Sequence, residues 1–174
     1  MLDRIARIED ELEHLTLLGQ FAKELRNLQV QQTTIEVDSW MKDYIDRACT
    51  TNSHLSLQIR KRGMQMRFDH QHLVRILDNL VENAKEAEAS VVQLRISTKT
   101  SGISIAVVDD GQGIRSNDRA QIWSPYFSTK PGLGRGQGLA TARALVEANY
   151  GHCDQPRREG NRTVMSFWIQ SHRQ

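Results

Sequence analysis

The hydrophobic pattern at the start of the chain predicts one long helix over residues 2–29. Apolar positions recur at steps of three and four residues, first at Ile5, Ile8, Leu12 and Leu15, then at Leu18, Phe21, Leu25 and Leu28. The register shifts near Gly19, as in the stammer of a coiled coil. Such an apolar stripe must be covered. A second chain would cover it, or, in the competing interpretation, its own domain.

Short strands and helices are expected after a polar connector at residues 29–34. Residues 34–37 read as a strand, and Asp38 or Ser39 would cap the following helix, which carries Trp40 and Tyr44. Residues 55–59 and 64–68 alternate between apolar and polar positions, as strands do, and could form a hairpin.

The second half of the chain has the clearest periodicity. Asp69 is expected to cap a helix that ends near residues 89–90 and whose apolar residues share one face: Leu73, Ile76, Leu77, Leu80, Val81 and Ala84. The remaining elements are expected as strands at 91–98 and 103–108, a long loop with a helical stretch at 118–123, a helix at 136–149 and a strand at 163–169. Three helices on one face of a mixed, mostly antiparallel sheet would form a two-layer α/β sandwich.

Composition adds little to this picture. The 174 residues suffice for one domain and an appendage, and 39% hydrophobic and 25% charged residues are ordinary for a globular protein. The net charge of +2 gives no reason to expect nucleic acid as a partner, and no run of 18 apolar residues predicts a membrane span. Cys49 and Cys153 form no CxxC pair and are expected to be reduced thiols.

Asn79 and Asn83 are the first candidates for ligand binding. A spacing of four places both amides on one side of the predicted helix, at the edge of its apolar face. An asparagine carbonyl oxygen is a hard, neutral ligand that suits Mg²⁺ beside phosphates. Taken alone, two surface asparagines would explain the pattern more simply.

An acidic turn follows the strand at 103–108. Asp109 stands at the end of this strand, where its carboxylate can accept a hydrogen bond from an amine such as that of adenine. Gly111 and Gly113 would let the backbone approach a ligand closely. An ordinary Asp-Gly turn is the alternative.

An aromatic loop and a glycine-rich loop complete the series. Phe127 and Lys130 belong to the first loop, where the aromatic ring could anchor a cover and the lysine could reach a phosphate. The second loop leads into a helix, whose first N–H groups favour phosphate, through Gly134, Arg135, Gly136, Gly138 and Leu139. Arg135 could add a charge-assisted contact. The dinucleotide fingerprint and the Walker A loop both fail, since no strand directly precedes this loop and no GK[ST] is present.

In this order the four segments resemble the N, G1, F and G2 boxes of the ATP-binding domain of sensor histidine kinases. The same superfamily includes gyrase, heat-shock chaperone ATPases and mismatch-repair ATPases. The resemblance runs from about Ile35 to Ile169 and implies a Bergerat-type sandwich that binds ATP and Mg²⁺. The roles it implies are Mg²⁺ and phosphate for Asn79 and Asn83, adenine for Asp109 with Gly111 and Gly113, the lid for Phe127 and Lys130, and the triphosphate for Gly134, Gly136 and Gly138.

Residues 1–30 resemble, less specifically, the second helix of a dimerisation and histidine-phosphotransfer hairpin, with residues 31–174 as the ATP-binding catalytic domain. This implies a homodimer through the N-terminal helix, in a four-helix bundle. It also implies a response-regulator receiver domain as partner. The implied location is the cytoplasm, either as a separate protein or as the cytoplasmic part of a membrane-anchored sensor. His14 lacks the following acid and the proline of the acceptor motif. The acceptor histidine is therefore expected outside this chain, on a hairpin in cis or in trans.

Asn79 also separates this chain from ATP-hydrolysing relatives. They carry a glutamate four residues before the Mg²⁺ asparagine, as general base for water. Asn79 cannot take up a proton, and Glu82 should point about 100° away from Asn83 on an ideal helix. We therefore expect a poor ATPase that transfers phosphate to a histidine. The alternatives are a serine kinase of the anti-sigma type, against which the long helix argues, and a non-catalytic, nucleotide-dependent binding module.

Overall fold

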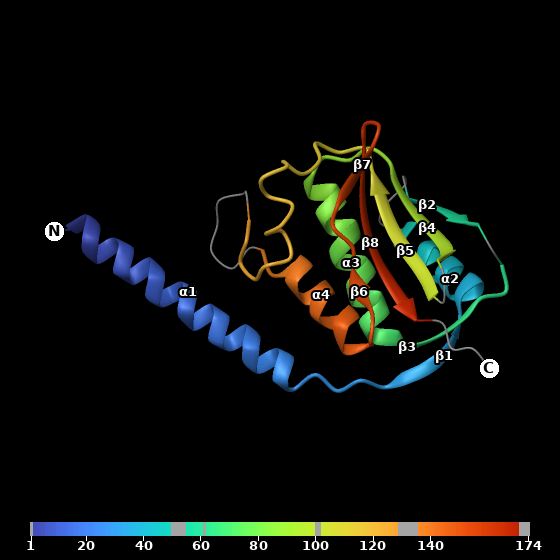
Figure 1. The fold of residues 1–174 in the computed structure, drawn as a ribbon, viewed down its shortest axis with the longest axis horizontal. Helices are drawn as coiled ribbons and strands as arrows, with labels where there is room; N and C mark the ends of the chain where they lie inside the picture. Colours follow the sequence, from blue (N-terminus) through green and yellow to red (C-terminus); the bar gives the residue numbers. More distant parts are fainter. Residues whose placement is uncertain (1, 50–54, 61, 100–101, 129–135, 171–174) are drawn as a thin grey trace.

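The computed structural model describes residues 2–49, 55–60, 62–99, 102–128 and 136–170 (Figure 1). Its helices are α1 (Leu2–Arg26), α2 (Val37–Cys49), α3 (His70–Glu86) and α4 (Gly138–Ala148). Its strands are β1 (Gln32–Glu36), β2 (Leu55–Ile59), β3 (Gln65–Asp69), β4 (Val92–Lys99), β5 (Gly102–Asp109), β6 (His152–Cys153), β7 (Arg157–Glu159) and β8 (Arg162–Gln170).

The main sheet has the strand order β2-β4-β5-β8-β6, with β7 also paired to β8. Only the pairing of β2 with β4 is parallel among the described strands. Helices α2, α3 and α4 all lie on the far side of this sheet in Figure 1. Alternate residues of β4, β5 and β8 point to these helices and are buried, as Ile96, Ile105 and Phe167 show. The predicted two-layer sandwich is confirmed.

Helix α3 forms where its local signals predict it. The Asp69 carboxylate accepts hydrogen bonds from the backbone N–H groups of Gln71 and His72, at 2.9 and 3.1 Å, and so caps the first turn. Its apolar face is completely buried, with Leu73 and Leu77 at 0% exposure. The helix ends a few residues before the predicted boundary, because the chain turns at Ala87. This helix is the wall on which the candidate site is built.

Several local predictions are wrong. The expected hairpin of residues 55–59 and 64–68 does not form, since β2 pairs with β4 and β3 pairs with β1 in a separate two-stranded sheet. Neither expected cap holds α2. The Asp38 carboxylate accepts from the N–H of Gly63 at 2.8 Å, and the Ser39 hydroxyl donates to the Glu36 carbonyl at 3.2 Å. Residues 118–123 form turns instead of a helical stretch.

Helix α1 extends away from the sandwich (Figure 1) and contacts it through residues of its second half. Leu12 and Leu15 are 59% and 63% exposed, whereas Phe21 is 7% exposed. The Phe21 ring packs edge-on against the Tyr126 ring, with centroids 6.4 Å apart. The helix thus packs on its own domain at Phe21 and leaves the two leucines open to solvent. None of the described helices is long and apolar enough to cross a membrane.

Candidate nucleotide site

A cavity of about 580 Å³ lies between α3, the loop after β5 and the start of α4. Its volume is in the range of small-molecule and cofactor sites. The predicted residues that line it are Asn79, Asn83, Asp109, Gly113, Phe127, Gly136, Gly138 and Leu139. Residues from segments far apart in the sequence therefore share one cavity. Lys130, Gly134 and Arg135 lie outside the described residues, as does the side chain of His14.

The two amides of α3 occupy the wall of this cavity. The Asn79 amide nitrogen is buried and has no hydrogen-bond partner among the described residues. A Cβ at Gly138 would lie 3.2 Å from the Asn79 amide oxygen, so Asn79 packs tightly against the first turn of α4. A buried donor without a partner is costly, and a ligand oxygen in the cavity would satisfy it. Amide oxygens at Asn79 and Asn83 fit Mg²⁺ in a phosphate complex, which keeps waters and phosphate oxygens as its other ligands.

Glu82 lies on the same wall, although it stands about 100° around the helix axis from Asn83. The cavity is lined by Asn79, Glu82, Asn83 and Glu86, at the i, i+3, i+4 and i+7 positions of one helix face. Residues three apart differ by only about 60° around the axis. The Glu82 carboxylate pairs with the Lys85 ammonium at 2.9 Å, and its side chain is 62% exposed. Glu82 is therefore held at the open rim.

The neighbouring aspartates Asp109 and Asp110 have different environments. Asp109 is 3% exposed, and this burial raises its carboxyl pKa, although the Gly111 N–H donates to it at 3.0 Å. Asp110 is exposed and accepts from the backbone N–H groups of Val91 and Ser90, both at 2.8 Å, which lower its pKa. Asp110 thus fastens the turn to the start of β4, and Asp109 is left to face the cavity.

The turn after Asp110 packs closely on the end of α3. Gly111 does not line the cavity, because its backbone lies against Ala87, where a Cβ would approach the Ala87 carbonyl oxygen to 2.5 Å. The Gln112 N–H donates to that same carbonyl at 2.9 Å. Glycine at this position therefore lets the backbone of the turn pack directly against the end of α3, next to the cavity.

Tyr126 and Phe127 meet Gly136 at the edge of the cavity. The Tyr126 N–H donates to the Gly136 carbonyl at 3.1 Å. Gly136 has φ +82°, and a Cβ there would overlap the Phe127 carbonyl. The Tyr126 hydroxyl donates to the Leu17 carbonyl of α1 at 2.6 Å and accepts from the Gln137 amide at 3.0 Å. The wall of the cavity is thereby tied to the N-terminal helix.

Thr163 also lines the cavity, and the sequence analysis missed it. It stands opposite Asp109 in the pairing of β5 with β8. A threonine at the start of a strand has no distinctive local pattern. Only the register between these two strands, which are far apart in the sequence, places it beside the carboxylate.

Part of the chain matches a known protein family. Residues 68–173 match the model of the family described as histidine kinase-, DNA gyrase B-, and HSP90-like ATPase. The chain is 26% identical over 163 residues to the sensor protein kinase PilS of Pseudomonas aeruginosa. The matched region covers 87% of this chain and 31% of PilS. It thus spans about a third of that relative's length.

Two solved structures have the same fold. Full-length ShkA in complex with AMPPNP gives a TM-score of 0.75 at 18% identity, over 98% of this chain and 39% of ShkA. ThkA in complex with the response regulator protein TrrA gives 0.71 at 18% identity, over 97% of this chain and 51% of the ThkA chain.

Proposed function

Because this chain belongs to the family of histidine kinase-, DNA gyrase B- and HSP90-like ATPases, we propose that it is the catalytic portion of a sensor histidine kinase. Membership of the family implies that it binds ATP. The proposal adds that the γ-phosphate passes to a histidine outside this chain. The observation that carries it is the shared cavity of Asn79 and Asn83, Asp109, and the loop ends Phe127 and Gly136.

In this proposal each wall of the cavity binds a different part of ATP. The Asp109 carboxylate accepts a hydrogen bond from the exocyclic amine of adenine. The free N–H groups at the start of α4, beside Gly138, face the phosphates, and the buried amide of Asn79 donates to a phosphate oxygen. Mg²⁺ would be held by the amide oxygens of Asn83 and Asn79, and it would offset the phosphate charge.

The transfer step needs an external nucleophile. A histidine imidazole nitrogen attacks the γ-phosphorus, a nitrogen–phosphorus bond forms, and the bond from phosphorus to the bridging oxygen breaks as ADP leaves. The chain contributes position and charge compensation. Asn79 cannot remove a proton from water, so transfer to water is slow. The phosphohistidine would then react with an aspartate on a response-regulator receiver domain. The structure of ThkA with a response regulator supports this partner class.

The same proposal includes a homodimer through α1. Leu12 and Leu15 are exposed there, and pairing with a second chain would cover them. The acceptor hairpin would then stand in cis or in trans. A cytoplasmic location belongs to the proposal too, since ATP and response regulators are available there.

Incubation with γ-labelled ATP, Mg²⁺ and a separate hairpin that contains an acceptor histidine tests this function. We expect acid-labile label on the hairpin histidine and little free phosphate from the chain alone. Acid-stable label on serine would instead indicate the anti-sigma type of kinase. Nucleotide binding without transfer to any hairpin would indicate a binding module. Rapid ATP hydrolysis by the chain alone would contradict the argument from Asn79.

A further inference from the structure

One row of the main sheet joins Asp109 to two side chains that the four sequence segments do not include. Asp109 of β5 stands opposite Thr163 of β8, and Thr163 stands opposite Arg158 of β7. Directly opposite residues in antiparallel strands point to the same face. This is the face covered by the helices, because Val107 and Met165, two residues further along the same strands, are buried in the main core. All three side chains are therefore on the side of the cavity.

Arg158 makes a directional contact in this row. Its Nη1 donates to the Thr163 hydroxyl oxygen at 3.2 Å. A guanidinium has only donors, so the Thr163 oxygen must accept, and the hydroxyl proton remains free to be donated elsewhere. The Asp109 carboxylate belongs to the residue directly opposite, and the Thr163 side chain lowers its pKa. Arg158 thus donates to Thr163 and leaves the Thr163 hydroxyl proton available for the Asp109 carboxylate, which stands opposite it in the strand pair.

The guanidinium of Arg158, an exposed residue, also lies against a glycine that lines the cavity. Gly113 lines the cavity and has φ +81°. A Cβ on Gly113 would overlap Nη1 of Arg158. The cation therefore lies directly behind the surface that Gly113 and Thr163 present to a ligand.

The positive charge of Arg158 lowers the pKa of the buried Asp109 carboxyl group. Burial and the nearby Asp110 raise the Asp109 pKa, and the guanidinium opposes them. Among the described residues, the other charged groups at the cavity are Glu82 and Glu86 from α3 and Arg115 and Asp118 from the loop. An ionised carboxylate has only acceptors and accepts more strongly from the amine of adenine, whereas a protonated carboxyl group can also donate to a carbonyl at the same position.

We propose that Arg158 is a positioning residue of the nucleotide site, which orients the Thr163 hydroxyl toward Asp109 and keeps Asp109 an ionised acceptor for the amine of adenine. Arg158 thereby favours purines that carry an amine over those that carry a carbonyl at this position. The inference rests on the proposed contact between Asp109 and adenine.

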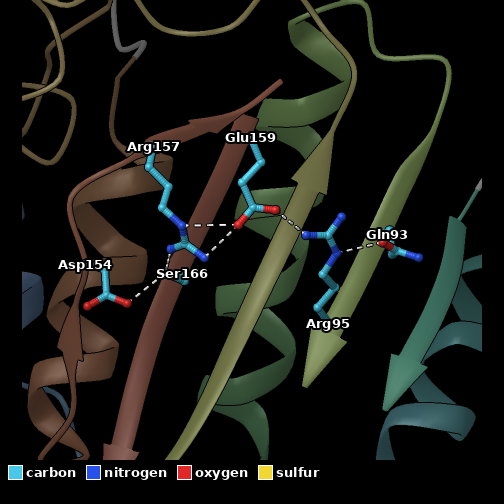
Figure 2. A network of polar contacts seen from close by, with 6 residues as sticks. All are labelled: Gln93, Arg95, Asp154, Arg157, Glu159 and Ser166. Atoms are coloured by element: carbon cyan, nitrogen blue, oxygen red, sulfur yellow. Dashed lines mark hydrogen bonds and ion pairs between the residues drawn. The ribbon is translucent and has the colours of Figure 1, made fainter. Parts of the chain in front are cut away.

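Arg157 provides a matched control, since it lies on the other face of β7. Figure 2 shows it in a polar network on the outer surface of the sheet. It donates to the Glu159 carboxylate at 3.2 and 3.3 Å and to the Ser166 hydroxyl at 3.3 Å. Arg95 holds the same carboxylate from β4. Replacing Arg157 removes an equal charge one residue away without touching Thr163 or Asp109.

The test measures Kd by calorimetry for non-hydrolysable analogues of ATP and inosine triphosphate between pH 5 and pH 8. The variants are R158M, R158K and R157M, each checked for wild-type folding by circular dichroism. We expect R158M to weaken ATP-analogue binding roughly 2- to 12-fold at neutral pH. We also expect it to move the acid loss of affinity to higher pH and to reduce the preference over the inosine analogue. R158K should restore the position of the acid loss, and R157M should behave as wild type.

Wild-type binding by R158M, or a weakening that is equal at every pH and for both nucleotides, would overturn the inference. The D109N variant separates this failure from a failure of the proposed adenine contact. If D109N loses affinity and its pH dependence while R158M does not, only the role of Arg158 is wrong. If D109N binds like the wild type, the adenine assignment fails and this inference fails with it.

Discussion

Replacing Asp109 by asparagine is expected to change nucleotide affinity and protein stability in opposite directions. The Asp109 side chain is 3% exposed, and one of its oxygens accepts from the Gly111 N–H. Asparagine has the same shape and can keep that hydrogen bond. It replaces the second oxygen with an NH₂ group, however, and this donor would face the amine of adenine, which is also a donor.

The loss in affinity follows from the hydrogen bond that disappears. A hydrogen bond to a charged group contributes about 1.5–3 kcal/mol, which corresponds to roughly a 10- to 150-fold increase in Kd. Calorimetric titration with a non-hydrolysable ATP analogue at pH 7 measures it. D110N is the control, because Asp110 is exposed and binds backbone N–H groups at the start of β4. Its affinity for the analogue should remain that of the wild type.

Stability should respond with the opposite sign. Burial raises the folded-state pKa of Asp109 above its unfolded value, so the folded state binds more protons between these two pKa values. The free energy of unfolding therefore falls as pH rises through this window. The asparagine side chain does not ionise, so D109N should be at least as stable as the wild type at pH 7, and its advantage should disappear in acid. Thermal unfolding from pH 3 to pH 7 tests this. Wild-type affinity, or a lower Tm at pH 7, would refute the reasoning.

Three other substitutions test the remaining walls of the site. G136A should lower the free energy of unfolding by about 1–2 kcal/mol through its left-handed dihedral alone, measured by denaturant titration; a neutral result would contradict the clash at the loop end. Y126F removes the hydrogen bond to α1 and should speed amide exchange around residue 21 about fivefold, whereas Y150F, at a 79% exposed ring, should not. N83A should reduce the Mg²⁺-dependent part of nucleotide affinity at least about tenfold, as titration with Mg²⁺ or EDTA would show. Q112A, also in the cavity lining, should leave that part unchanged.

Hydrophobic periodicity and helix capping, which act over a few neighbouring residues, predicted helix α3 and the strand that ends in Asp109. Helix α3 follows from its 3.6-residue apolar period and from the Asp69 cap, both of which act within one or two turns. The buried strand that ends in Asp109 follows in the same way from its run of apolar residues. The grouping of four segments into one site came from resemblance to a known family, because nothing in their spacing along the chain reveals which segments meet.

Periodicity and capping could not predict which strands pair with each other. Alternation identified the segments 55–59 and 64–68 as strands, but a strand exposes the same backbone groups to any neighbour. In the structure the first segment pairs with β4 and the second with β1. The 100° angle between Glu82 and Asn83 did not reveal that Glu82 lines the cavity, three residues after Asn79 on the helix.

The amino-acid sequence by itself determined the long helices and most of the strands, though not β6 and β7, and it determined which chemical groups were available for a nucleotide. Periodicity and capping act over a few residues, so the linear order suffices for them. The tertiary structure alone decided that Thr163 and Arg158 stand behind Asp109, because strand register is set by the packing of a whole sheet against its helices.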